Sequence, residues 1–86
     1  SDDSFIDTNE FKNILDAAIN QLAPKCREIF LLSKQEELCN REIAERLGVS
    51  IKTVENQMTI ALKKLREYLM PFRGKIFFYF LLYFLS

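Results

Sequence analysis

Apolar side chains in the first part of the chain recur every three or four residues, which is the spacing of one helix face. The first such stretch spans residues 11–22, and Asp7 and Glu10 ahead of it have the spacing of a capping box. The pattern predicts a first helix that begins after Asp7. Residues 1–6 are mostly small and polar and are predicted to be the end of a linker.

A second helix is predicted from Pro24, because proline suits the first helical turn, to about Glu37 or Leu38. Its apolar positions are so dense that most of this helix is expected to be buried. The residues on this buried side are Cys26, Ile29, Phe30 and Ser33, with Leu31 and Leu32 widening the stripe.

Two further helices follow, separated by a short turn. Asn40 is predicted to be the N-cap of a short helix from about Arg41 to Leu47. Gly48 takes the C-cap position, where a left-handed backbone costs glycine little. Ser50 is then the predicted N-cap of a fourth helix over residues 51–69, which Pro71 and Gly74 end.

The fourth helix has one apolar face and one polar face. The apolar positions are Ile51, Val54, Met58, Ala61, Leu62, Leu65 and Leu69. The polar positions are Lys52, Glu55, Asn56, Thr59, Lys63 and Arg66. Such a division predicts that the apolar side packs on the domain and that the polar side faces outward.

Residues 40–59 have the pattern of a helix-turn-helix. Ala44 is small where two helices approach closely, Gly48 makes the turn, and Val54 packs the second helix on the first. The shared core is predicted to consist of Ile43, Leu47, Val49 and Ile51. The predicted fold is therefore all-α, a small four-helix domain over residues 7–70 with a C-terminal helix-turn-helix. The alternative is a plain helical hairpin without a role in DNA binding.

The charge of the chain is unevenly distributed, although its formal net charge is zero. Residues 1–50 carry six basic and ten acidic side chains, a balance of −4. Residues 51–75 carry six basic and two acidic side chains, a balance of +4. A basic segment on an acidic domain fits an electrostatic footprint for nucleic acid, and the alternative is a solvated, lysine-rich helix face.

The residue types argue against an enzyme. The sequence has no histidine, no glycine-rich phosphate loop and no paired-carboxylate arrangement, so we predict neither catalytic residues nor a cofactor. Cys26 and Cys39 lack the spacing of metal ligands, so no metal site is predicted. We interpret them as two reduced core thiols of a cytoplasmic protein.

On the helix-turn-helix interpretation, the N-terminal part of the fourth helix reaches the base edges of DNA in the major groove. Asn56 has an amide that can pair with adenine, Glu55 a carboxylate that can accept from cytosine, and Thr59 a side chain for a thymine methyl. Other side chains are expected on phosphates, which position the protein without reading sequence. These predicted backbone contacts are Arg41, Lys52, Thr53, Lys63 and Lys64. The alternative for each is an ordinary exposed side chain.

Four stretches in combination resemble a known family. They are LAPKCREIFLLS (22–33), NREIAERLGVS (40–50), KTVENQM (52–58) and ALKKLRE (61–67). With their surroundings from Ala18 to Leu69, they resemble the C-terminal region-four domain of a bacterial sigma factor. The resemblance is closest to the extracytoplasmic function (ECF) group, in the form abundant in Bacteroides and its relatives.

This resemblance implies binding to the upstream (−35) promoter element and docking on the β-subunit flap of core RNA polymerase. It also implies an anti-sigma factor as a further partner, as is common in the ECF group. The sequence departs from many relatives at Glu55 and Ile60, where a basic residue is common. This departure changes the base contacts that the resemblance implies, but not the docking mode. The region-two domain that opens the promoter is absent from these residues, so we do not expect them to start transcription alone.

A rival family and a rival class share some of these features. The LuxR-type effector domains of response regulators also use EIAERLGVS and KTVEN, but LAPKCREIFLLS and ALKKLREYL fit the sigma domain better. The rival from a different functional class is a helical protein-protein interaction module that uses its first two helices and its C-terminal tail.

The tail over residues 71–86 contains an uninterrupted apolar run, IFFYFLLYFL, at 76–85. Ten helical residues cover only about 15 Å of a 30 Å bilayer core, so no transmembrane span is predicted. A helix that is apolar on every side must be buried, and we predict a protein contact: self-association, polymerase or an anti-sigma factor. The alternatives are packing on the first two helices and an interfacial membrane anchor, which would lack a matching basic face.

Overall fold

A computed structural model describes residues 8–72 of the protein, and the regular elements among these residues are all helices. The elements in chain order are α1 (Thr8–Asn20), α2 (Pro24–Lys34), α3 (Asn40–Leu47), α4 (Ile51–Leu69) and a 3-10 turn, η1 (Met70–Phe72). The predicted all-α fold of four helices is thereby confirmed. No helix in the described part is long and apolar enough to cross a membrane.

Three predictions concern residues outside this range. The linker at 1–6, the cap at Asp7 and residues 73–86 of the tail predicted over 71–86 all lie outside the described residues. The start of α1 at Thr8 is therefore described without its cap.

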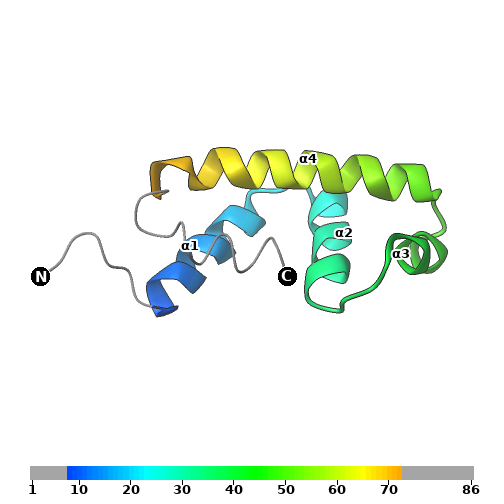
Figure 1. The fold of residues 1–86 in the computed structure, drawn as a ribbon, viewed down its shortest axis with the longest axis horizontal. Helices are drawn as coiled ribbons and strands as arrows, with labels where there is room; N and C mark the ends of the chain where they lie inside the picture. Colours follow the sequence, from blue (N-terminus) through cyan, green and yellow to red (C-terminus); the bar gives the residue numbers. More distant parts are fainter. Residues whose placement is uncertain (1–7, 73–86) are drawn as a thin grey trace, which may run out of the picture.

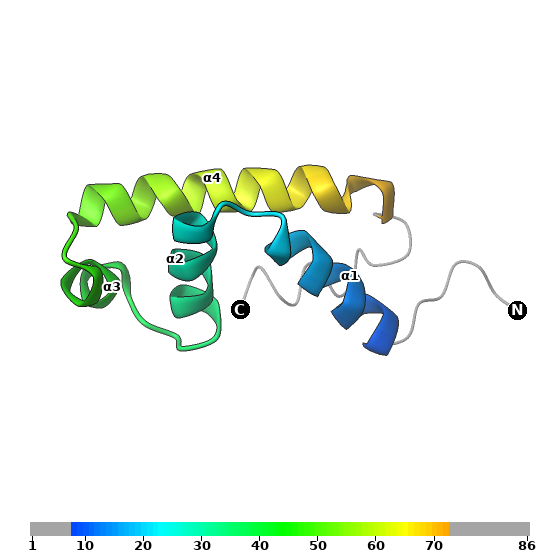
Figure 2. The ribbon, with the colours of Figure 1, turned by 180° about the vertical axis from the view of Figure 1, so that it is seen from behind.

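Helix α4 runs the length of the described structure, and the three other helices pack along one side of it (Figures 1 and 2). Helix α1 lies beside the C-terminal half of α4, α2 beside its middle and α3 beside its N-terminal end. One long helix therefore contacts every other helix, and its opposite side faces outward.

The buried side chains form two apolar clusters. The larger one joins α1, α2 and α4 through residues such as Ala18, Phe30 and Leu65, which are fully buried. The smaller one joins α2, α3 and α4 and consists of Ile29, Ile43, Ala44 and Val54. Neighbouring α2 residues, Ile29 and Phe30, thus belong to different clusters, and Met58 packs against both.

Cys26 is buried, as predicted, and its Sγ donates to the carbonyl oxygen of Gln57 at 3.4 Å. Burial raises the pKa of the Cys26 thiol, and the charge of Lys64 opposes that effect. The prediction that both cysteines are core thiols is wrong for Cys39, which is exposed. Cys39 is the residue just before α3, and its side chain lies outside the apolar core.

Helix α2 is shorter than predicted and ends at Lys34 rather than near Glu37 or Leu38. Glu37 has a left-handed backbone with φ of 56°, which turns the chain, and the Leu38 N–H donates to Leu32 O at 3.1 Å. Leu38 then packs against the smaller cluster. This burial offsets a conformational cost of roughly 1–2 kcal/mol for a left-handed residue other than glycine.

The cap of α3 is also displaced by one residue from the prediction. Cys39 is the N-cap, with an extended backbone, and Asn40 is the first helical residue. The Cys39 N–H donates to the Glu42 carboxylate at 2.9 Å. Glu42 is the third residue of the helix, and its side chain accepts this bond as in a capping box. The position of Glu42 therefore fixes the start of α3, although asparagine is the better cap by residue type.

Candidate nucleic-acid interface

The turn between α3 and α4 depends on Gly48. Its backbone is left-handed, with φ of 69° and ψ of 35°, as predicted. The next amide, of Val49, donates to Ala44 O at 3.0 Å, which is the six-to-one bond of a Schellman motif. Nothing lies within 4 Å of the site that a Cβ would occupy at Gly48, so the backbone conformation alone requires glycine there.

Ser50 is the N-cap of α4, as predicted. Its Oγ accepts from the Thr53 N–H at 3.0 Å, and its hydroxyl contacts the Thr53 Oγ1 at 3.0 Å. The backbone at Ser50 is extended, with φ of −78° and ψ of 157°. The glycine and the serine together break the chain into two helices, so α3 and α4 do not form one continuous rod.

Val54 anchors α4 on α3. It is fully buried, and it shares the smaller cluster with Ile43 and Ala44, as predicted from the sequence. The half-buried Val49 packs against the same cluster. The prediction that Ile51 belongs to this core is wrong, because its side chain is 43 % exposed. Ile51 is the first residue of α4.

The anchored side of α4 leaves an exposed strip on its other side. The strip, which we call the α4 strip, consists of Lys52, Glu55, Asn56, Thr59 and Lys63, all of which are exposed. Their spacing of three or four residues places them on one face of the helix. The structure therefore brings together all three predicted base-reading residues and two of the five predicted backbone-contacting residues.

The other two predicted backbone-contacting residues on α4, Thr53 and Lys64, lie beside the α4 strip. Lys52 and Lys64 are twelve positions apart, which is about 120° around a helix of 3.6 residues per turn. Thr53 is about 100° from Lys52 by the same measure. Lys64 is exposed, whereas Thr53 is half-buried and bonded to Ser50. The fifth candidate, Arg41, is exposed in the first turn of α3.

The lysines of this surface are available for phosphates. Lys52, Lys63 and Lys64 form no ion pair within the part of the chain that the structure describes. In contrast, Lys25 on α2 pairs with Glu28 at 3.3 Å. A row of cations without carboxylate partners is what a phosphate backbone requires.

The hydroxyl of Thr59 is already used within the helix, because its Oγ1 donates to the Glu55 carbonyl oxygen at 3.0 Å. The methyl group of Thr59 is then the group best suited to an outside contact. A contact of this methyl group with a thymine methyl stays a prediction.

One exposed neighbour of the α4 strip was missing from the predicted site. Ile60 is 42 % exposed and lies one turn from both Asn56 and Lys63. The sequence signal for this residue was an apolar side chain within the polar face of the helix. It can supply an apolar contact beside the three polar readers.

A short helix, a glycine turn and a longer helix with an exposed basic strip are the parts of a helix-turn-helix DNA-binding domain. The family model described as sigma-70, region 4 matches residues 12–65, which is 54 of the 86 residues. The chain therefore belongs to the sigma-70 region 4 family, a DNA-binding region of sigma factors for the −35 element and not a catalytic one. No curated protein and no solved structure matches the chain.

Proposed function

We propose that this domain recognises the upstream (−35) promoter element by placing the N-terminal half of α4 in the major groove. The observation that carries the proposal is the α4 strip, which is exposed on the helix that follows the Gly48 turn. Recognition helices contact base edges with their N-terminal residues, and Glu55, Asn56 and Thr59 lie in the first half of α4.

Each of the three base readers has its own chemistry. The Asn56 amide can donate to and accept from adenine at once, and the Thr59 methyl can contact thymine. The Glu55 carboxylate can accept from cytosine N4, which offsets its repulsion by nearby phosphates. The three exposed side chains therefore support a specific base preference rather than binding to any duplex.

The basic and hydroxyl side chains around these readers contact the DNA backbone. Lys52 and Lys63 lie at the two ends of the α4 strip, and Thr53 and Lys64 lie beside it on one side of the helix. Arg41 approaches from α3, the helix that crosses the backbone in this class. We place the domain at residues 7–70, so that all these contacts come from one folded unit.

We infer a role in transcription initiation, with docking on the β-subunit flap of core RNA polymerase, as an ECF-group sigma factor. Family membership supports the interaction with promoter DNA and polymerase. The four sequence stretches that resemble the ECF group support the subtype, and with it an anti-sigma factor as a regulatory partner.

Two measurements test this function. The first is a pull-down of purified core RNA polymerase with the 86-residue chain, repeated with a chain that lacks residues 75–86. The second is selection of duplexes from a randomised pool, read by sequencing. We expect retention of polymerase by both chains and enrichment of one short sequence.

The two results separate the candidate functions. Base-specific duplex binding without retention of polymerase would favour the LuxR-type effector domain over the sigma domain. Loss of both activities would contradict the proposed function and favour an interaction module. Loss of polymerase binding on removal of residues 75–86 alone would assign polymerase docking to the tail.

A further inference from the structure

An apolar groove runs between α1 and the end of α2. It has a volume of about 320 Å³ and is lined by Phe11, Leu15 and Ile19, with Lys12, Asp16, Lys34 and Gln35 at its rim. The three apolar residues belong to the larger cluster or pack against it. The groove is thus a surface extension of the domain core and is distinct from the α4 strip.

The described chain ends on the apolar cluster that underlies this groove. Phe72, in η1, packs against the same cluster as Phe11. Residues 73–75 separate Phe72 from the apolar run at 76–85. Because an extended residue spans about 3.3–3.6 Å, this connection allows the run to begin up to roughly 13 Å from Phe72.

The apolar run also matches the groove in length and chemistry. Ten helical residues extend about 15 Å, and the eight steps from Phe11 to Ile19 extend about 12 Å. The run contains no charged residue, so it can leave the rim charges of Lys12 and Asp16 in water. A segment without a polar face needs an apolar surface to cover it.

We propose that residues 76–85 of this chain dock along the groove between α1 and α2 of the same molecule. The groove and the apolar run are then two halves of one intramolecular contact. Helix α4 turns its buried side toward α1, so the α4 strip points away from the docked segment. The tail therefore extends the core and leaves the DNA-binding surface open.

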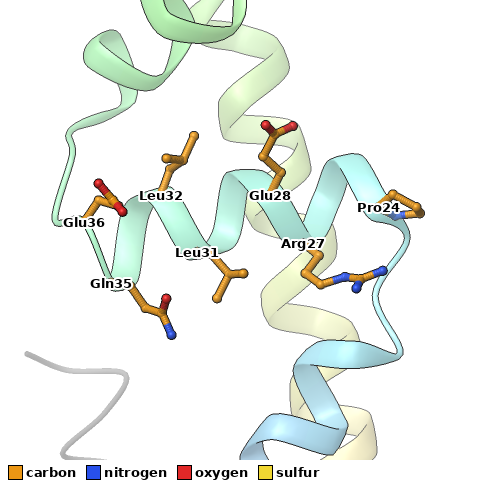
Figure 3. Close-up of a pocket in the computed structure, with 7 residues that line it drawn as sticks. All are labelled: Pro24, Arg27, Glu28, Leu31, Leu32, Gln35 and Glu36. Atoms are coloured by element: carbon orange, nitrogen blue, oxygen red, sulfur yellow. The ribbon is translucent and has the colours of Figure 1, made fainter.

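A second groove, along α2, suits the tail less well. It has a volume of about 530 Å³, and Figure 3 shows that the side chains along it include Arg27, Glu28 and Glu36. The Nε of Arg27 is buried there without a hydrogen-bond partner, while its Nη2 donates to Leu22 O at 3.4 Å. An apolar segment on this surface would desolvate charged groups without offering them a partner.

Cross-linking within one chain tests the docking. In a Cys39→Ser background, Asp16→Cys on the groove rim is combined with Tyr79→Cys in the run and treated with a short bismaleimide. The matched control combines Tyr79→Cys with Glu67→Cys, an exposed position on α4 away from α1. Lys12→Cys serves as a second reporter on the rim in case Asp16→Cys impairs folding.

We expect both rim pairs to cross-link within one chain about tenfold faster than the control pair, because docking raises the local thiol concentration. Equal rates for rim and control pairs would overturn the proposal. Cross-links that form only between two chains would overturn it as well and would assign the groove to a second copy. Equal rates for rim and control pairs in solution, together with capture of the chain by phosphatidylglycerol vesicles, would assign the run to a membrane surface instead.

Discussion

Asn56 is the residue on which base recognition depends most directly. It is exposed on the α4 strip, one turn from both Lys52 and Thr59. We expect Asn56→Ala to cost about 1–3 kcal/mol on the preferred duplex, because a bidentate pair with adenine is lost. Fluorescence anisotropy on duplexes that differ at one base pair measures this cost.

The matched control for this variant is Asn13→Ala, an exposed asparagine on α1. It should leave affinity and preference unchanged. An equal loss with Asn56→Ala on every duplex would contradict base reading and would make Asn56 a phosphate-contacting or structural residue.

Gly48 determines where the recognition helix begins. Any residue with a Cβ is strained at its φ of 69°, although no atom would clash with that Cβ. We expect Gly48→Ala to lower the free energy of unfolding by roughly 1–2 kcal/mol, the cost of a left-handed alanine. Urea denaturation followed by circular dichroism measures this change.

Asparagine tolerates the left-handed region better than alanine. Gly48→Asn should therefore be the milder substitution. If alanine and asparagine were equally tolerated, the left-handed turn between α3 and α4 would not be the feature that requires glycine.

At the scale of elements, the start of α3 is expected to depend on pH. The Cys39 N–H holds the pKa of Glu42 below its usual value, with smaller contributions from the nearby Arg41 and Arg46. The ionised carboxylate therefore stabilises the folded state. This stabilisation is complete above the usual glutamate pKa of about 4.3 and is lost as the pH falls through the lower, folded value.

Glu42→Gln keeps an acceptor for the Cys39 N–H but removes the charge. We expect the variant to be less stable than the wild type at pH 7 and equal to it in acid below the folded pKa. Thermal unfolding of both proteins across this pH range measures the difference. A difference that stays constant down to acid pH would contradict the cap as its cause.

The helices show how far local sequence signals determine this fold. The start of α2 at Pro24 and the cap of α4 at Ser50 were predicted because their side chains act within one turn. The end of α2 was missed because packing of Leu38 against the smaller cluster favours a left-handed Glu37. This contact is between different elements, so the periodicity of α2 alone does not predict it.

The candidate interface shows the same division. Helical periodicity predicted that Asn56, Thr59 and Lys63 share an exposed face, as they do. It also assigned Ile51 to the core, although this first residue of α4 is 43 % exposed. Burial at the end of an element depends on its neighbours, and the sequence of that element does not specify them.

At the scale of the whole molecule, α2 and α4 connect the two apolar clusters into one structure. Ile19 belongs to the larger cluster and Ile43 to the smaller one, and both are buried. Because Met58 packs against both clusters, we expect one cooperative unfolding transition. The helix-turn-helix then has the stability of the entire domain.

Removing one methyl group from either cluster tests this coupling. Ile19→Val and Ile43→Val should each lower the free energy of unfolding by about 0.5–1.5 kcal/mol, in the same single transition. The matched control, Ile51→Val, lies at an exposed site and should have little effect. Urea titration with amide exchange as a second probe measures these changes, and separate transitions for the two clusters would contradict the coupling.

The central claim is that the α4 strip binds DNA through its cations. The most direct test is the salt dependence of duplex binding for the double variant Lys52→Gln/Lys63→Gln. The double variant Lys12→Gln/Lys25→Gln on α1 and α2 removes the same charge from other faces and serves as its control. The slope of log affinity against log salt is negative, and each lost phosphate contact makes it less steep by about 0.9.

We predict that the α4 variant binds more weakly and that its negative slope is less steep than the wild-type slope by about 1.8. The α1 and α2 variant should keep the wild-type slope. An unchanged slope for Lys52→Gln/Lys63→Gln, or an equal change in both variants, would contradict the account.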